Sequence, residues 1–473
     1  MRRGVVALLV LIVTAFGPAA AGPPHDLVEL HMSTPAAPDY TTEDRGLRGP
    51  VAAAIRRAFP GLEVSHRLSR AAAAYARLLE TPDASQPPQA GIDFILHWAG
   101  CPDATASSTV LYTTGDGAGE VVDALRKLAG RLGEERPTAV GVARVPATVE
   151  PYRWRWGIFL VTRRFRLRRF PSSGTPGATI PLQLRLDPGL ADPEVVLLRP
   201  SGRIETVPVA SAGSWSIASI PLGTERGTLW VELVATARSG PMVVALFPVT
   251  VGGSPPVAWS GPPPPDERSI RTAADAERLM VRLINADRER FGLPPLAPDP
   301  RLAAIAREHS RDMAIHGYFG HVSPTEGGLA RRLAEGHYAM RYSGENISRA
   351  DSIYEAEEAL MMSPGHRANI LATEPTVVGV GIVAAGSGER REWVITQLFA
   401  RPLERIDAER FRRKVRRLLE RAARKAGVAP PGRDAKLDAV VESVTRAAAA
   451  SGASTGEIVR RIAGRLREQG IVY

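Results

Sequence analysis

Three short segments between residues 320 and 370 carry side chains that could do chemistry. They span residues 320–324, 343–347 and 363–370. Each places one imidazole or carboxylate, from His321, Glu345 or His366, among small or turn-forming residues. Two imidazoles and one carboxylate at a common place can bind a small ligand, hold a metal ion or exchange protons. We therefore predict a shared cleft lined by these three side chains, with Ser363 and Asn346 as further ligand-binding candidates.

The residues around His366 predict how its ring is positioned. Ser363 suits an N-cap and Pro364 suits the first helical position, which places His366 in the first turn of a short helix. Residues 352–362 predict a longer helix just before it. Because the positive end of a helix disfavours imidazolium, we expect His366 to be neutral near pH 7.

Glu345 stands between Gly344 and Asn346, a context that predicts a tight turn. Its carboxylate could pair with a histidine and stabilise the histidine cation. An alternative reading is structural: Asn346 and Asn369 are residue types that often bind buried backbone groups in turns. Both readings remain open from the sequence.

A ligand set of His321, Glu345 and His366 suits zinc, copper or nickel better than calcium. Three protein ligands with one open position is also a common arrangement for catalytic zinc. However, the sequence contains neither a G-x-S-x-G elbow nor an H-E-x-x-H helix, so familiar hydrolase machinery is missing. No cofactor is certain, and a divalent metal such as zinc remains a hypothesis.

The elements around these segments resemble a known family. An opening helix, residues 299–302, the three segments above and a closing Val-Gly-Val-Gly at 378–381 before a strand at 393–399 occur in this order. From Glu277 to Pro402 the chain resembles a bacterial member of the CAP superfamily, the cysteine-rich secretory, antigen 5 and pathogenesis-related 1 proteins with an SCP-like domain. The resemblance implies an α-β-α sandwich over residues 275–402, with His321, Glu345 and His366 in its central cleft.

Some members of this family carry a second acid in the helix before the last histidine. Here Ser363 stands at that place, and Glu357 and Glu358 are out of register. This departure weakens the case for tight metal binding. Family members are mostly secreted and have disparate activities, including lipid or sterol binding, so the resemblance alone says little about chemistry.

The whole chain adds further expectations about class and location. Residues 1–21 have the layout of a secretory signal peptide, and no later segment is apolar enough for a transmembrane helix. The single cysteine, Cys101, excludes an intramolecular disulfide. The net charge of +10 comes without any nucleic-acid-binding motif, so we expect no nucleic-acid partner. We expect a secreted, periplasmic or extracellular protein.

The predicted fold class is α+β with several units. A Pro- and Gly-rich stretch at 252–270 predicts a linker, and period-two alternation over 174–251 predicts an antiparallel β-sandwich. Residues 45–170 repeat features of the 275–402 unit at an offset of 234, for example Leu68 against Leu302, and predict a degenerate CAP-like domain. Residues 405–473 predict a helical tail that retains only the first helices of a further copy.

Three functions follow as hypotheses. The leading one is a non-enzymatic binding or interaction protein that uses the His/Glu cleft for a small ligand, a metal or a partner such as a lipid or an envelope component. The second is a metal-assisted hydrolase acting on envelope or extracellular polymers, with catalytic residues unknown. The third is a cell-surface scaffold whose cleft is vestigial. Whether the protein is an enzyme is undecided, with more weight against it.

Overall fold

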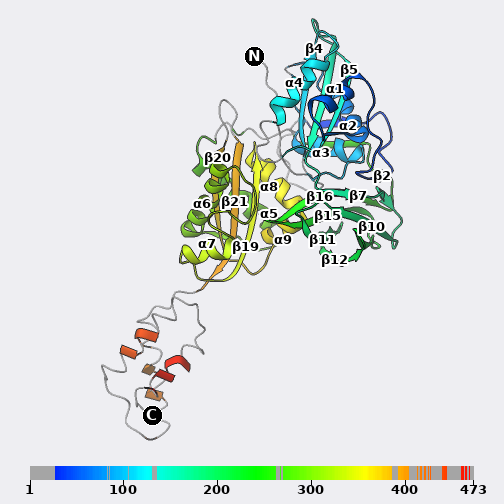
Figure 1. Ribbon diagram of the computed structural model, residues 1–473. Coiled ribbons are helices and arrows are strands. Elements are labelled where there is room, and N and C mark those ends of the chain that lie inside the picture. The colour runs from blue at the N-terminus through cyan, green and yellow to red at the C-terminus, as the bar shows by residue number, and fades with distance from the viewer. Residues whose placement is uncertain are drawn as a thin grey trace.

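The computed structural model describes residues 27–403 apart from 83, 85, 105, 130–135, 263–266, 268–269 and 386–391, together with scattered positions beyond 403. The predicted signal peptide lies outside the described residues, and the predicted helical tail lies mostly outside them. The described part is a mixed α+β structure (Figure 1). Among its helices, none is both long enough and apolar enough to cross a membrane.

The N-terminal unit is built on a four-stranded sheet in the order β3-β5-β6-β4. The strands are β3 (Glu63–Val64), β5 (Ala139–Pro146), β6 (Trp154–Val161) and β4 (Ser107–Thr113). β3 is parallel to β5, and the other pairs are antiparallel. Its helices are α1 (Pro50–Ala58), α2 (His66–Leu78), α3 (Gln89–Trp98) and α4 (Ala118–Ala129). Buried residues of α1 and α4 pack on one face of the sheet, and those of α2 and α3 form a separate core.

Two sheets enclose a second core in the middle of the chain. One contains β13 (Val209–Ala212), β14 (Trp215–Pro221), β10 (Thr179–Leu186) and β7 (Phe165–Leu167). The other contains β12 (Ile204–Val207), β11 (Ala191–Leu198), β15 (Gly227–Ala237), β16 (Gly240–Val251) and β9 (Ser173–Gly174). Apolar side chains from both sheets alternate inward and share one buried cluster. We call this unit the β-sandwich.

Two short strand pairs tie the units together. Within the predicted linker, β17 (Ala258–Gly261) pairs with β1 (Val28–His31) near the start of the described chain. A second pair joins β2 (Asp39–Tyr40) to β8 (Phe170–Pro171). The stretch predicted as a linker therefore contributes hydrogen bonds to the N-terminal unit.

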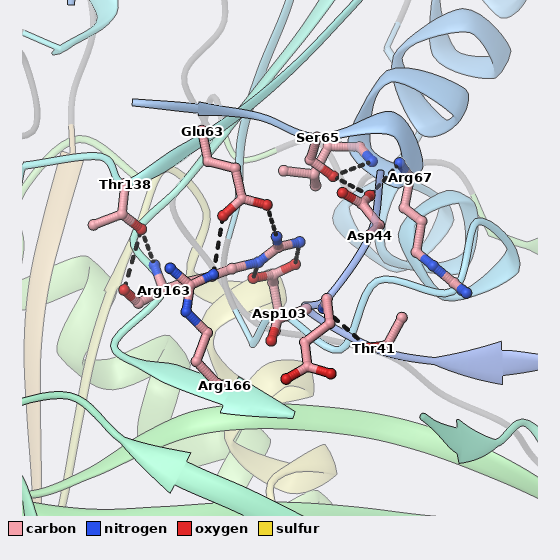
Figure 2. Close-up of polar contacts among 12 residues, drawn as sticks. Thr41, Asp44, Glu63, Ser65, Arg67, Asp103, Thr138, Arg163 and Arg166 are labelled. Carbon is pink, nitrogen blue, oxygen red and sulfur yellow. Dashed lines mark hydrogen bonds and ion pairs between the residues drawn. The ribbon is translucent and has the colours of Figure 1, made fainter. Parts of the chain in front are cut away.

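Two ion pairs lie where the N-terminal unit meets the β-sandwich, and the second of them joins the two units (Figure 2). Arg163 donates from Nε and Nη2 to the two carboxylate oxygens of Asp103, at 2.8 and 2.9 Å. Arg166, in β7, donates to Glu63 in β3 at 3.0 Å. Because one guanidinium binds both oxygens of the buried carboxylate, neither group of the first pair is left uncompensated.

The C-terminal unit has three layers. Its sheet runs β18-β20-β21-β19, formed by β18 (Ala297–Pro298), β20 (Val377–Ala385), β21 (Glu392–Pro402) and β19 (Met340–Ala350). α5 (Ala273–Arg290) and α8 (Ile353–Met362) pack on one face, and α6 (Pro300–His316) and α7 (Leu329–Glu335) pack on the other. A short α9 (Pro364–Ile370) follows α8.

The N-terminal and C-terminal sheets have the same order and the same strand directions. In both, the short edge strand is parallel to its neighbour and the other pairs are antiparallel. A glycine in the second strand lets the underlying helix approach closely in each unit. A Cβ atom at Gly141 would lie 2.1 Å from the carbonyl carbon of Leu68, and one at Gly379 would lie 2.4 Å from that of Leu302.

Candidate functional site

Glu345 lies inside strand β19, and the expectation of a tight turn at this residue is wrong. Its backbone pairs with Leu398 of β21. The neighbouring residue 344 is a glycine for a different reason from the expected turn. A Cβ atom at Gly344 would lie 2.7 Å from Oδ1 of Asn369. The glycine therefore allows α9 to approach β19 closely, which brings the His366 segment next to Glu345.

His321 and Glu345 form a direct pair, and Arg332 completes it. Nδ1 of His321 lies 2.9 Å from Oε1 of Glu345. Arg332, in α7, donates to both carboxylate oxygens, to Oε2 at 2.9 Å and to Oε1 at 3.1 Å. It also donates to the carbonyl oxygen of His321 at 3.0 Å, which holds the histidine segment in place.

The charge state of Glu345 follows from these partners. Burial by itself raises the pKa of this carboxyl group, but the hydrogen bonds from His321 and Arg332 and the charge of Arg332 outweigh it, so the pKa lies below its ordinary value. Glu345 is therefore an ionised acceptor, and His321 donates from Nδ1. Three of the roughly four acceptor positions of this carboxylate are occupied, which favours an anchoring role for Glu345.

Sequence reasoning missed Arg332. It is the buried member of the pair Arg331 and Arg332 on a short helix, and only 4% of its surface is exposed. Nothing distinguishes it in the sequence from its exposed neighbour except helical phase, which seven residues define poorly.

His366 is anchored through Ser363. Nδ1 of His366 lies 2.7 Å from Oγ of Ser363. The Ser363 hydroxyl donates to a carboxylate oxygen of Glu232, and the backbone N–H of Gly365 donates to the other at 3.0 Å. When Glu232 is ionised, Ser363 gives its one hydroxyl proton to that carboxylate, so Ser363 accepts from Nδ1 of His366. Nε2 of His366 then carries the lone pair.

The expected neutrality of His366 has a different physical cause from the one inferred above. Burial, with a smaller contribution from His321, lowers the pKa of His366 to about 3. Ser363 is the N-cap of α9 by backbone position, but its side chain makes no capping hydrogen bond because it binds Glu232 instead. Desolvation is therefore the main cause of the neutral charge of His366.

Glu232 comes from the β-sandwich, in strand β15, and is fully buried. Burial raises its pKa to about 7, while its bonds to Ser363 and Gly365 act in the opposite direction. It supplies a carboxylate beside Ser363, the position at which some CAP proteins carry their own acid. The only signal in the sequence is an acid inside the apolar run Trp230 to Val234.

The β15–β16 hairpin of the β-sandwich also contacts the His321 segment. The backbone N–H of Val322 donates to the carbonyl oxygen of Ser239 at 2.8 Å. A Cβ atom at Gly320 would lie 2.5 Å from Cβ of Ser239, and one at Gly240 would lie 3.1 Å from Cβ of His321. The glycine before His321 is thus required by the neighbouring unit, and both histidine segments contact the β-sandwich.

A chain of amides lies behind the histidines. Asn346 donates from Nδ2 to the carbonyl oxygen of His366 at 3.1 Å, and Asn369 donates to that of Glu345 at 3.1 Å. Gln397 accepts from Asn346 and donates to the buried Glu357 at 2.6 Å. The two asparagines therefore do bind buried backbone groups, and they join α9 to β19.

The expected three-ligand metal set is not assembled. Glu345 has both oxygens committed to Arg332 and His321. Among the described residues, the group whose ligand atoms lie within 4.8 Å of one another is a different one, namely His309, Asp312 and Glu326. The carboxylate of Asp312 already accepts hydrogen bonds from Tyr318 Oη at 2.5 Å, Ser323 Oγ at 2.6 Å and Thr325 Oγ1 at 2.9 Å. At the histidines a metal would have two imidazoles and no free carboxylate.

Comparison with known proteins identifies the C-terminal unit. Residues 281–399 match CAP, the cysteine-rich secretory protein family, and form a domain of this family. The uncharacterized protein YkwD of Bacillus subtilis is 40% identical over 112 residues, which cover 24% of this chain and 44% of YkwD. The uncharacterized membrane protein YlbC of the same organism is 37% identical over 120 residues, covering 25% of this chain and 34% of YlbC. The chain thus spans less than half the length of these relatives.

Among solved structures, an extracellular SCP-domain protein of Bacillus anthracis is 24% identical, with a TM-score of 0.25 over 41% of this chain and 67% of that one. A cysteine-rich secretory protein of Staphylococcus aureus is 13% identical, with a TM-score of 0.22 over 50% and 85% of the two chains. The family assignment rests on the sequence match at 281–399, with the three motif segments inside it.

Proposed function

We propose that the chain is an exported, non-enzymatic binding protein whose ligand contacts Nε2 of His321 and of His366. One observation supports this most directly: each ring has its Nδ1 bound to an acceptor, Glu345 in one case and Ser363 in the other. With Glu232 ionised, Nδ1 is the donor in each of these hydrogen bonds, so Nε2 is the nitrogen that a neutral ring offers as an acceptor. The expected ligand therefore presents N–H or O–H donors.

The metal-assisted hydrolase is the weaker candidate. In that hypothesis Glu345 is the general base or a metal ligand. Glu345 is bound on both oxygens, and Glu232 is bound to Ser363 and Gly365. The third hypothesis is a scaffold with a vestigial site. It gives no reason for both histidine rings to be held through Nδ1, by Glu345 and by Ser363.

Two features support the wider architecture we infer. The strand order β3-β5-β6-β4 repeats that of β18-β20-β21-β19, which supports reading residues 45–170 as a degenerate CAP-like copy. The solved relative from Bacillus anthracis is described as extracellular, and the layout of residues 1–21 is that of a signal peptide. We infer a secreted, periplasmic or extracellular protein in which the β-sandwich contributes Glu232 to the CAP domain's site.

A matched pair of probes tests the proposal. Acetamide carries N–H donors, and N,N-dimethylacetamide keeps the carbonyl group but has methyl groups in place of both N–H hydrogens. At pH 8, acetamide is expected to shift the ¹⁵N resonances of Nε2 in His321 and His366 with millimolar affinity, and dimethylacetamide is expected not to. His366→Ala should abolish the response, and His66→Ala, in the exposed N-terminal part of α2, should preserve it.

Two results would contradict the proposal. The first is an equal response to both amides, because it would show that the lone pairs are not recognised. The second is stoichiometric zinc of micromolar affinity together with hydrolytic activity that is lost in His366→Ala. That outcome would favour the hydrolase.

A further inference from the structure

A cavity of about 760 Å³ lies in the N-terminal unit, away from the histidine site. Its walls come from residues 31–34, the start of α1, one face of α2 and strand β5. Apolar side chains form much of the lining, among them Leu47, Val51, Leu78, Trp98 and Trp156. Its volume is within the range of about 300–1,000 Å³ that is typical of small-molecule sites.

The charge of the lining is strongly one-sided. Four arginines contribute to it, Arg48, Arg70, Arg77 and Arg144, whereas Asp116 is the one acidic residue among the lining side chains that the structure describes. The guanidinium carbon of Arg70 lies 3.8 Å from the ring centroid of Trp98. For Arg48 and Arg77 the described residues provide no ion-pair partner. The cavity thus combines an apolar wall with uncompensated positive charge.

The comparison of the two CAP-like units explains why this space is open. When the two units are aligned with an offset of 234 residues, Pro50 at the start of α1 corresponds to Ile284. Helix α5 begins eleven residues earlier, at Ala273, and this first part of α5 has no helical counterpart in the N-terminal unit. The strands of the two units align with a slightly larger offset of 238 residues, which relates Gly141 to Gly379. Each of these glycines lies against the equivalent leucine of the helix beneath it, in α2 or α6. The N-terminal unit therefore lacks about three turns of helix.

In the CAP domain this part of α5 closes the edge of the sheet. Glu277 accepts from Nε of Arg307 at 2.8 Å and from the backbone N–H of Ile382 at 3.1 Å. The counterparts of these two partners at the offsets above are Ala73 and Arg144, and both line the cavity. The place taken by Glu277 and its helix in one unit is a cavity in the other.

We propose that this cavity binds a small amphipathic anion, with a carboxylate or phosphate head among the arginines and an apolar body against Trp98 and Trp156. In this proposal a bound anion occupies the place that the carboxylate of Glu277 occupies in the CAP domain, and the positive lining attracts it. A charged head and an apolar body both fit this lining, because the arginines lie beside apolar side chains that include Trp98 and Trp156. The proposal is independent of the histidine site.

Octyl phosphate is a suitable probe, since it combines both features and is monomeric at working concentrations. The full chain is expected to bind it, with quenching or enhancement of tryptophan fluorescence. Octanol and inorganic phosphate, which each lack one feature, should bind at least tenfold more weakly. Arg77→Glu should weaken octyl phosphate binding about tenfold, which corresponds to about 1.4 kcal/mol.

Matched variants separate the cavity from general surface charge. Arg57→Glu makes the same charge change on α1 at an exposed residue outside the cavity, and binding should be unchanged. Ala73→Trp fills the cavity and should abolish binding. Circular dichroism checks that Ala73→Trp is folded, and Arg77→Glu keeps the test decisive if it is not, because Arg77 is exposed.

The result that overturns the proposal is octyl phosphate affinity that is equal in the wild type, Arg77→Glu and Ala73→Trp, or absent up to millimolar concentration. Vesicles containing phosphatidic acid distinguish the source of the anion. Co-sedimentation that is lost in Ala73→Trp would assign the head group to a membrane lipid. Binding of the monomeric probe without co-sedimentation would assign it to a free amphiphile.

Discussion

The Ser363 hydroxyl group donates a hydrogen bond to the carboxylate of Glu232, which lies 131 residues earlier in the chain and in a different unit. Ser363 is in turn the acceptor for Nδ1 of His366. Glu232 therefore fixes which nitrogen of His366 carries the proton. The site is shared between the CAP domain and the β-sandwich.

Replacing Glu232 by leucine should destabilise the protein. Ser363 Oγ and the Gly365 N–H would lose their buried acceptor, at a cost of about 1–3 kcal/mol for each unsatisfied group. Urea unfolding of the full chain measures the change. Glu194→Leu, at an exposed position of the same β-sandwich, is the control and should change the unfolding free energy by less than about 0.5 kcal/mol. An equal effect of the two substitutions would argue against the contact.

Arg332→Met should be strongly destabilising because it leaves the buried carboxylate of Glu345 without its bidentate partner. Breaking one side of a buried ion pair costs about 3–5 kcal/mol. Arg331→Met is the matched control, since Arg331 is 61% exposed and pairs with Glu335 at the surface. A surface pair of this kind is worth about 0–1 kcal/mol. Thermal unfolding of both variants would refute the prediction if their midpoints fell equally.

Stability should fall as the pH rises from mildly acidic to mildly alkaline. Burial, reinforced by Asp287, raises the pKa of Glu357 from 4.5 to about 8. The native state then holds a proton that the unfolded state has lost, so the native state is favoured below pH 4.5 and loses this advantage as the pH approaches 8. Glu232, with a pKa of about 7, acts in the same direction.

Glu357→Gln isolates this contribution. Between pH 6 and pH 8 the wild type should lose about 2 kcal/mol more unfolding free energy than the variant, since each pKa unit is worth about 1.4 kcal/mol. Chemical denaturation at several pH values measures the difference. Glu374→Gln, at an exposed position, should follow the wild type. Parallel pH profiles of wild type and Glu357→Gln would show that Glu357 is not the source.

Gly320→Ala should separate the β15–β16 hairpin from the His321 segment. The added methyl group would lie 2.5 Å from Cβ of Ser239 and 2.7 Å from its backbone oxygen. Because one of these atoms belongs to the backbone, the clash is relieved only if the hairpin or the His321 segment moves. Hydrogen exchange at the Val322 amide should accelerate at least tenfold, because its bond to Ser239 is lost. In Gly328→Ala the nearest atom is Cγ2 of Val322 at 3.9 Å, an ordinary contact, and exchange should be unchanged.

The sequence predicts the local features of the CAP domain well. The helix expected over 352–362 is α8, which has Ser352 as its N-cap, and the strand expected at 393–399 is part of β21. These features depend on short-range chemistry: capping side chains, a proline at a helix start and apolar alternation. Such signals lie within a few residues of the structure they specify.

The rest of the site depends on tertiary contacts that no local pattern encodes. Gly344 suggested a turn at Glu345, but the glycine is needed for contact with Asn369 across α9 and β19. Glu232 contributes from another unit, and Arg332 is buried only because α7 packs against the sheet. The identities of the histidines could be predicted from sequence, whereas the partners that fix their protons required the fold.

The most direct test of the central claim is the protonation pattern of the two imidazoles. In a protein with ¹⁵N-labelled histidine at pH 8, long-range ¹H–¹⁵N spectra should show His366 as a neutral ring protonated at Nδ1, and should show a proton on Nδ1 of His321. His366 should also remain neutral on acidification until the pH approaches its pKa of about 3. A proton on Nε2 of His366, or an imidazolium there near pH 6, would contradict the account.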